Sequence, residues 1–277
     1  MLDVKEVTLR IVPLQDVLLH EQIEKKRVEQ LTARLQGDWF LKNPPIVSAC
    51  DGKYILLDGA TRVTALRRLG CRDVAAQLVD YDAPDLLLET WNHILLDLPV
   101  ADFFAALERI AGLRVVATDP ATADVALAQR TSIGSILLSD GAVRMLCASH
   151  NAPLAEQSHL LNQIVAEYEG RGEMYRVAHT DLELLLAEHA RLTALVVFPR
   201  FQPDEIRRLA LNGAKLPMGI TRHIIPGRAM RINLPLDILC DDSPLDAKNA
   251  WLAEWLKTKM RERHVRYYHE PVFLFDE

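Results

Sequence analysis

The residues best suited to chemistry lie in one stretch, ILLDGATRVTALRRLG, at residues 55–70. A short apolar strand runs into an Asp-Gly turn, and helical spacing of apolar residues begins directly afterwards. The first turn of a helix has N–H groups without intrahelical acceptors and a partial positive charge. Because Gly59 has no side chain, an anion can approach the N–H groups near Ala60, Thr61 and Arg62. The stretch therefore predicts a phosphate-binding turn.

Two charged side chains flank this turn. Arg62 lies one turn into the helix and could add a bidentate contact to a phosphate. Asp58 beside a phosphate is unfavourable unless a cation such as Mg²⁺ lies between the two anions. The alternative interpretation is that Asp58 only caps the helix and that Arg62 is a solvated surface charge.

The order of strand, DGxxR turn, helix and ALRRLG resembles the ParB/sulfiredoxin superfamily over roughly residues 5–95. More specifically, the chain resembles the free L-serine kinases, including the ParB-like serine kinases of siderophore gene clusters. Four features carry this resemblance: the pair His20-Glu21, the turn from Asp58 to Arg62, Trp91, and the motif Thr221-Arg222-His223. The last motif lies outside the shared nucleotide-binding module and favours a serine kinase over other members of the superfamily.

The resemblance implies a role for each residue of the first domain. Glu21 resembles the catalytic base, a carboxylate that accepts the proton of the substrate hydroxyl as the bond to phosphorus forms. Asp58 would act beside it in catalysis and hold the metal ion. The phosphates of the nucleotide would bind at four neighbouring positions: Gly59, Ala60, Thr61 and Arg62. The alternative for Glu21 is a loop residue in solvent.

A free amino acid presents a carboxylate and an ammonium group to the remaining motif. Arg222 can bind the carboxylate with its forked guanidinium, and Thr221 and His223 can donate or accept beside it. Trp91 could form a wall of the small pocket. The alternatives are a core aromatic residue on a helix for Trp91 and an edge strand with outward polar side chains for the motif. Arg228 fits a second anion contact and a salt bridge equally well.

The chain also departs from its relatives. Many of them carry one or two His residues in the turn where this chain has Ala60 and Thr61, so any side-chain role for a His is lost there. The turn lacks the reactive Cys of sulfiredoxins, which argues against that activity. No helix-turn-helix signature follows, and the net charge is −6. Both observations argue against nucleic acid as the main partner.

Composition indicates an ordinary globular protein. The chain has 277 residues, of which 49% are hydrophobic and 25% charged, so it can bury a sizeable core. No apolar run is long enough to span a membrane, and the N-terminus lacks a signal-peptide pattern. We therefore expect a cytoplasmic protein without a membrane partner. The four scattered cysteines are expected to be small buried hydrophobes rather than a disulfide framework or a zinc site.

Periodicity predicts an α+β fold in two domains. Residues 1–100 would form a ParB/sulfiredoxin-like nucleotide-binding domain, and residues 101–277 an α+β domain that completes the substrate site. Strands are expected at 7–11, 46–49, 54–57, 74–79, 114–116, 132–141, 142–148, 195–198, 223–232 and 272–275. Helices are expected at 25–36, 61–69, 86–96, 120–130, 153–168, 180–190, 203–212 and 246–263.

The combined interpretation is a kinase that transfers a phosphoryl group from ATP or ADP, with Mg²⁺, to the hydroxyl of free L-serine, giving O-phospho-L-serine. The sequence does not choose between the two nucleotides, and it leaves the oligomeric state open. A second hypothesis is a ParB-like, nucleotide- or ligand-responsive DNA-binding transcriptional regulator. A third is a kinase for another small hydroxylated amino acid, such as threonine or homoserine.

Overall fold

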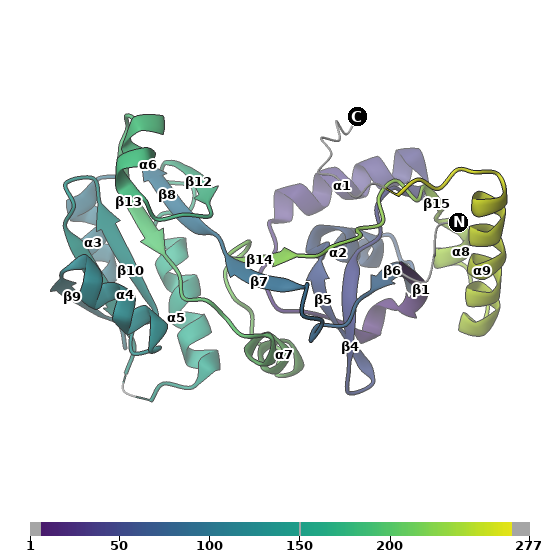
Figure 1. Ribbon diagram of the computed structural model, residues 1–277, viewed down its shortest axis with the longest axis horizontal. Helices are drawn as coiled ribbons and strands as arrows, with labels where there is room; N and C mark the ends of the chain where they lie inside the picture. The colour runs from purple at the N-terminus through teal and green to yellow at the C-terminus, as the bar shows by residue number, and fades with distance from the viewer. Residues whose placement is uncertain (1–6, 150, 268–277) are drawn as a thin grey trace. The chain divides into compact units, whose positions relative to one another are not determined.

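A computed structural model describes residues 7–149 and 151–267, and it confirms the mixed α+β class. The chain divides into two compact units (Figure 1). Unit 1 comprises the chain up to Leu18, Glu24–Asp85, and the chain from Ile225 onward; unit 2 comprises Leu19–Ile23 and Leu86–Ile224. This division differs from the single boundary expected near residue 100, because the chain leaves unit 1 and later returns to it.

Unit 1 is built on a five-stranded sheet. Its strands, in spatial order, are β1 (Thr8–Pro13), β6 (Asp73–Leu78), β4 (Ile46–Cys50), β5 (Lys53–Asp58) and β2 (Val17–Leu19), with a short 3-10 turn, η2 (Leu14–Asp16), before β2. β1 pairs with β6 and β4 with β5 in antiparallel fashion, and β4 pairs with β6 in parallel. Helices α1 (Lys25–Asp38) and α2 (Ala60–Arg68) pack together and bury Val28, Leu35, Val63 and Leu66.

A C-terminal helix covers the edge of this sheet. Helix α9 (Leu245–Arg261) packs on β1, which pairs with only one strand (Figure 1). The Asn249 side chain accepts from the Ile11 N–H and donates to the Ile11 carbonyl, each at 2.9 Å. These bonds satisfy edge groups that would otherwise be open to another chain. Before α9 lie β15 (Leu234–Pro235), which pairs with β3 (Phe40–Leu41), and the short helix α8 (Asp237–Cys240).

Two of the four cysteines do not behave as the sequence predicts. Cys71, after α2, forms a disulfide with Cys240 at the end of α8, across 169 residues of sequence. The spacing gives no sign of this pair, because it is created only when the C-terminal segment returns to unit 1. Cys50 and Cys147 take part in no disulfide, and Cys147 is buried as expected.

Unit 2 has a six-stranded antiparallel sheet. Its spatial order is β12 (Glu173–Val177), β8 (Asn92–Leu96), β13 (Leu192–Val197), β10 (Gly134–Leu138), β11 (Val143–Cys147) and β9 (Arg114–Thr118). Its helices are α3 (Val100–Leu107), α4 (Pro120–Ala128), α5 (Leu154–Ala166), α6 (Leu182–Glu188) and α7 (Pro203–Leu211). A separate two-stranded ribbon pairs β7 (Leu87–Thr90) with β14 (Thr221–Ile224).

Most elements agree with the sequence predictions, and two do not. The helix expected over residues 86–96 is instead two strands, β7 and β8, separated by Trp91. All five residues of β8 are buried, so its apolar run shows no period of two, and periodicity cannot identify it. The strand expected over 223–232 ends at Ile224. The strand expected over 272–275 lies outside the described residues.

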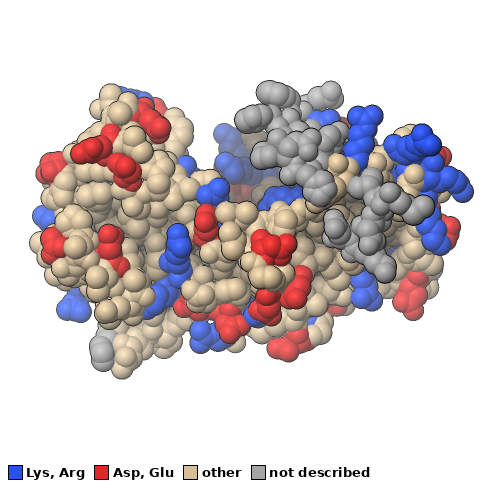
Figure 2. All heavy atoms as spheres, viewed as in Figure 1, with Lys and Arg blue, Asp and Glu red and all other residues tan. Residues whose placement is uncertain are grey.

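The surface carries both signs of charge. On the face shown in Figure 2, Lys and Arg side chains gather near the end of α9. Lys257 there pairs with Glu254 at 2.6 Å, and Lys259 lies over the Trp255 ring at 5.3 Å. These contacts agree with a solvated helix face. Within the described part of the chain, no helix combines the length and apolar character that crossing a bilayer requires.

Candidate functional site

The predicted phosphate-binding turn forms at the start of α2. Gly59 precedes the helix with φ of 103°, a left-handed conformation that side chains disfavour. A Cβ added there would lie 2.9 Å from Pro45 Cβ, so only glycine fits. The first helical bond runs from the Val63 N–H to the Gly59 carbonyl, so the N–H groups of residues 60–62 have no acceptor within the helix. These three residues are only partly buried, which leaves the turn open to an anion.

Asp58 is held by two guanidinium groups rather than acting as a helix cap. Its Oδ2 accepts from Arg62 at 2.9 Å and from Arg228 at 3.2 Å. No side chain caps α2. Two cations and one anion leave one net positive charge beside the N-terminus of the helix. The cluster therefore favours an anionic ligand even though an aspartate lies at its centre.

Arg62 differs from both earlier interpretations. Its guanidinium also donates to the carbonyls of Asn43 at 3.1 Å and Pro44 at 2.5 Å, and its side chain is only 23% exposed. It is therefore neither a solvated surface charge nor a group free to bind a phosphate with its whole fork. It fixes the loop before β4 against the turn. Arg228, for which the sequence left two options open, forms the salt bridge.

The segment that carries Arg228 is fixed by two amide side chains. Buried Gln77 donates to the Gly227 carbonyl at 3.0 Å and accepts from the Ala229 N–H at 2.8 Å. Asn43 accepts from the Arg231 N–H at 2.7 Å. These bonds replace strand pairing, and they explain why the expected strand over 223–232 stops early while its backbone stays fixed.

A metal ion would find one carboxylate in this cluster. Both guanidinium contacts use Oδ2 of Asp58, so Oδ1 is the oxygen that a metal ion would take. Mg²⁺ is commonly bound by one or two carboxylates together with substrate phosphates and water. Across the described residues, no group of three or more His, Cys, Asp or Glu side chains could hold a metal ion. The donor set thus fits an ion that arrives with a nucleotide and not a preformed protein cage.

Glu21 lies in unit 2, bound to the segment that precedes β14. Its main chain forms a parallel bridge with Leu216, flanked by bonds from the Leu216 N–H to the His20 carbonyl and from the Gln22 N–H to the Leu216 carbonyl, both 2.8 Å. Its carboxylate accepts from the N–H groups of Gly219 and Thr221, each at 2.8 Å. Glu21 is therefore a half-buried, oriented carboxylate and not a loop residue in solvent.

A chain of hydrogen bonds reaches Glu21 from a buried histidine. The Thr221 hydroxyl donates to Glu21 Oε1 at 2.6 Å and lies 2.9 Å from His20 Nε2. Since the hydroxyl proton points to Glu21, His20 Nε2 must carry a proton and donate to Thr221. The His20 ring also packs edge-on against the His223 ring at 5.5 Å. Each carboxylate oxygen has two lone pairs, so one acceptor position remains on Oε2 of Glu21.

The β7–β14 ribbon separates the remaining predicted residues by face. Side chains alternate along a strand, so Arg222 points to the opposite face from Thr221 and His223. Arg222 pairs across the ribbon with Glu89 at 3.1 Å, and its guanidinium carbon lies 4.5 Å from the centre of the Trp91 ring. Trp91 follows β7 directly and donates its backbone N–H to the Ile220 carbonyl. It is neither on a helix nor fully buried.

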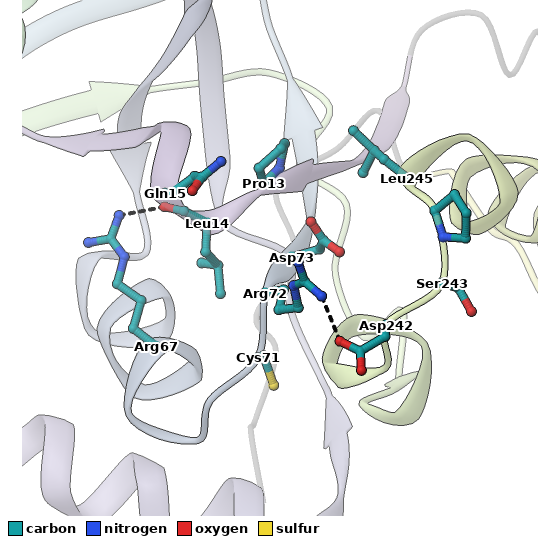
Figure 3. A pocket seen from close by; sticks show the side chains of 11 residues that line it. Pro13, Leu14, Gln15, Arg67, Cys71, Arg72, Asp73, Asp242, Ser243 and Leu245 are labelled. Carbon is teal, nitrogen blue, oxygen red and sulfur yellow. Dashed lines mark hydrogen bonds and ion pairs between the residues drawn. The ribbon is translucent and has the colours of Figure 1, made fainter.

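The predicted residues thus form three groups. The turn from Asp58 to Arg62 belongs to unit 1 and gains Arg228. Glu21, Thr221 and His223 lie together in unit 2 with His20, while Arg222 and Trp91 share the other face of the ribbon. None of these residues lines the pocket of about 620 Å³ in Figure 3, which belongs to unit 1 and is bordered by Arg67, Arg72, Asp242 and the disulfide residue Cys71.

The sequence did not single out several residues that shape these groups. Glu89 is two residues from Trp91 and lies on the same face of the chain. The sequence predicts a helix there, in which residues two apart do not share a face. Asn43 and Gln77 act on the backbone of a segment more than 140 residues away, and no local pattern reports such contacts. Gly219 is a turn glycine whose importance appears only when its N–H meets Glu21.

Comparison with known proteins agrees with the resemblance stated from the sequence. No protein-family model matches the chain. The chain is 26% identical over 273 residues to the ATP-dependent L-serine kinase SbnI of Staphylococcus aureus, and the alignment covers 97% of each chain. It is 23% identical to the ADP-dependent L-serine kinase SerK of Thermococcus kodakarensis, over 85% of this chain and 94% of the relative. The predicted resemblance to free L-serine kinases is confirmed.

Solved structures of free serine kinases have a similar fold. A C-terminally truncated SbnI covers 94% of this chain and 100% of its own, with a TM-score of 0.76 and 23% identity. A free serine kinase in complex with AMP covers 84% of this chain and 94% of its own, with a TM-score of 0.72 and 19% identity. The chain therefore has the fold of the free serine kinases. Among these relatives, SbnI is the one that it resembles over almost its whole length.

Proposed function

We propose that this protein is a kinase that transfers a phosphoryl group from ATP or ADP to the hydroxyl of free L-serine, producing O-phospho-L-serine. The observation that carries the proposal is the geometry of Glu21. Three hydrogen bonds from Gly219 and Thr221 fix its carboxylate, and one acceptor position on Oε2 remains for a substrate hydroxyl. The similarity to ATP- and ADP-dependent L-serine kinases supplies the substrate and both candidate nucleotides.

In the proposed reaction, Glu21 accepts the proton of the serine hydroxyl. The hydroxyl oxygen forms a bond to the terminal phosphorus of the nucleotide while the bond between that phosphorus and the bridging oxygen breaks. The nucleotide leaves with one phosphoryl group fewer. A base at the hydroxyl contributes typically 10²–10⁴-fold to such proton transfers.

Residues of unit 1 serve the nucleotide in this proposal. The N–H groups of Ala60, Thr61 and Arg62 bind phosphate oxygens, and Gly59 allows the close approach. Mg²⁺, when bound, would neutralise charge on the transferred group, with Asp58 Oδ1 as the protein ligand. Arg228 and Arg62 then hold the other carboxylate oxygen and keep the cluster net positive. Phosphoryl transfer depends mainly on such positioning and charge.

The serine itself would be held by the ribbon residues of unit 2. Thr221 and His223 lie on the same face as His20. The Thr221 hydroxyl donates to Glu21, and the His223 ring packs against the His20 ring. Arg222 and Trp91, which the resemblance also implies for substrate binding, lie on the other face of the ribbon, where Glu89 pairs with Arg222. One serine molecule is too small to contact both faces, so in the proposed reaction the substrate lies on the face of Thr221 and Glu21.

The comparisons favour the kinase over the DNA-binding regulator, since the curated relatives reported above are named as L-serine kinases. Threonine and homoserine stay as alternative substrates. The fold does not distinguish these two substrates from serine, so the assay below compares all three.

The test is direct product detection. Purified protein is incubated with L-serine, Mg²⁺ and either ATP or ADP, and O-phosphoserine is measured by mass spectrometry. We expect product with at least one nucleotide, and less with threonine or homoserine at equal concentration. Omission of Mg²⁺ in the presence of a chelator should abolish turnover. A folded protein that makes no O-phosphoserine with either nucleotide would contradict the proposal.

A further inference from the structure

A partly buried arginine lies against the segment that holds Glu21. Arg176, on the edge strand β12, donates to the Met218 carbonyl at 3.2 Å. Its guanidinium also packs against the next residue, Gly219: a Cβ added to Gly219 would lie 2.2 Å from the guanidinium carbon. Gly219 has φ of +68°, a backbone conformation that favours glycine, and any side chain there would have to displace the end of the Arg176 side chain.

The residue against which Arg176 packs is one of the two backbone donors to Glu21. The Gly219 N–H donates to Oε2 and the Thr221 N–H to Oε1, each at 2.8 Å. One short segment therefore supplies both backbone donors to the carboxylate. The turn at Met218 and Gly219 thus sets the direction of the donor that contacts Oε2, the oxygen with the remaining acceptor position.

Arg176 is itself fixed by the sheet of unit 2. It pairs across β12 and β8 with His93, which is 1% exposed and lies 2.8 Å from the Tyr168 hydroxyl through Nδ1. Burial and the nearby Arg176 charge lower the pKa of His93 to about 3, so this histidine is neutral at pH 7 and does not repel the arginine. The cationic side chain of Arg176 therefore extends from the edge strand β12 to the turn at Met218 and Gly219.

We propose that Arg176 is a positioning residue for the proposed kinase reaction: through the Met218 carbonyl and the Cα of Gly219 it fixes the turn whose N–H groups orient the Glu21 carboxylate. The inference deepens the proposed function, because it rests on Glu21 as the base. Arginine suits this task better than lysine, since its planar guanidinium can pack flat on a glycine while donating to the neighbouring carbonyl.

The expected consequence is a change in turnover and not in nucleotide binding. Loss of the arginine would let the turn at Met218 rotate, so Glu21 would sample orientations that do not reach the hydroxyl. Small misplacements of a catalytic group are costly for rate. The nucleotide turn in unit 1 shares no residue with this contact. A general loss of folding would instead lower stability and every kinetic parameter together.

The first test compares Arg176→Met and Arg176→Lys with the wild type. We expect kcat for O-phosphoserine formation to fall by about 30-fold in Arg176→Met and by about threefold to tenfold in Arg176→Lys, with the KM for nucleotide within twofold. The control is Arg191→Met. Arg191 is exposed and binds Glu173, which lies on β12 like Arg176. This substitution should leave kcat unchanged. Equal kcat in the wild type and Arg176→Met would overturn the inference.

The second test does not depend on activity. Amide hydrogen exchange of Gly219 and Thr221 is measured by NMR in the absence of substrate. We expect both amides to exchange at least tenfold faster in Arg176→Met, while amides of β8 and β13 stay protected. Unchanged protection of Gly219 and Thr221 would overturn the inference even if kcat fell. If the wild type makes no O-phosphoserine, the proposed function fails, and this measurement still decides whether Arg176 fixes the turn.

A third variant approaches the same contact from the other side. Gly219→Ala places a methyl group in the space of the guanidinium, so we expect a loss of kcat similar to that of Arg176→Met. Because both substitutions disturb one contact, the double variant should lose clearly less than the product of the two separate losses. Strictly multiplicative losses would show that the two residues act independently and would contradict the proposal.

Discussion

Asp58 in unit 1 and Glu21 in unit 2 are the two carboxylates that the sequence assigned to catalysis, and their surroundings are opposite in kind. Asp58 contacts two guanidinium groups, from Arg62 and Arg228. Glu21 contacts only neutral donors, two backbone N–H groups and the Thr221 hydroxyl. The first arrangement collects positive charge at a helix N-terminus, and the second orients a negative charge without cancelling it. The first suits the binding of an anion and the second the acceptance of a proton.

The contrast extends to the contacts that support each unit. Unit 1 joins distant segments by charge and covalent chemistry: the Cys71–Cys240 disulfide, and Lys248, whose fully buried ammonium lies 2.7 Å from Asp73 and 3.1 Å from Asp241. The hydrogen bond from Lys248 is the main cause that lowers the pKa of Asp241. Unit 2 instead buries the neutral pair His93 and Tyr168 in its core. The two units should therefore respond to different perturbations.

The largest expected effect comes from the neutral-donor carboxylate. Glu21→Gln keeps the shape and one acceptor oxygen but removes the base. We expect kcat for O-phosphoserine formation to fall by about 10³-fold, or about 4 kcal/mol in activation free energy, with nucleotide affinity unchanged. The matched control is Glu24→Gln, a nearby glutamate that pairs with Arg27 on the surface. Retention of more than a tenth of the activity by Glu21→Gln would remove Glu21 as the base.

The second effect concerns the covalent link of unit 1. Cys240→Ser should lower the free energy of unfolding under oxidising conditions by about 3 kcal/mol, because the disulfide restricts the unfolded chain. Urea denaturation with and without dithiothreitol measures this. The reductant should lower the stability of the wild type to that of the variant and leave the variant unchanged. Cys50→Ser, at a cysteine outside the disulfide, serves as the control. Equal stability of the wild type in both conditions would show that the link does not contribute.

The third effect tests unit 2 by pH. The pKa of His93 is lowered to about 3 by burial and by Arg176, whereas in the unfolded chain it is near 6.5. The unfolded state therefore binds the proton more readily, and stability falls as the pH drops below about 6.5 and continues to fall toward 3. Between pH 7 and pH 5 we expect a loss of about 2 kcal/mol from this group, measured by urea denaturation.

The control for that pH dependence removes the titrating group. His93→Gln should be less stable than the wild type at pH 7 but should lose less stability between pH 7 and pH 5. His159→Gln, at an exposed position on α5, should keep the dependence of the wild type. A slope that is identical in the wild type and His93→Gln would assign the acid sensitivity to other groups.

The smallest effect concerns the paired carboxylate. Arg228→Met removes one of the two cations at Asp58, so the cluster loses its net positive charge. We expect the nucleotide Kd, measured by calorimetry, to rise about tenfold, or about 1.4 kcal/mol, and the salt dependence of binding to weaken. Arg231→Met, three residues further along the same segment, should change the Kd by less than twofold. An unchanged Kd in Arg228→Met would mean that the second guanidinium only supports the fold.

The local parts of this structure could be predicted from the sequence. The DGxxR turn can be predicted from its local sequence, because an Asp-Gly pair between a strand and a helical pattern has few conformations other than a tight turn. Most helices and hairpins follow from apolar spacing, including the turn at Asp140-Gly141 between β10 and β11. One failure lies where burial is complete: all five residues of β8 are buried, so its sequence does not alternate, and the neighbouring Trp91 was assigned to a helix.

The long-range parts could not be predicted in this way. Nothing near Cys71 indicates that Cys240 will lie beside it, and nothing near Glu21 indicates that Gly219 will donate to it. Family resemblance supplied Glu21 and the Thr221–His223 motif, but it did not show that Arg222 lies on the other face of the ribbon with Glu89. Such contacts depend on the path of the whole chain and not on a local pattern.

The return of the chain to unit 1 has a consequence for protein synthesis. Residues 86–224 leave the ribosome as one continuous stretch, so nearly all of unit 2 can form while unit 1 still lacks the segment from Ile225 onward. Cys71, Asp73 and the edge of β1 must wait for Cys240, Lys248 and Asn249 to be translated. Domains generally fold as units during translation. Unit 1 is therefore begun first and completed last, because its final segment is translated only after the whole of unit 2.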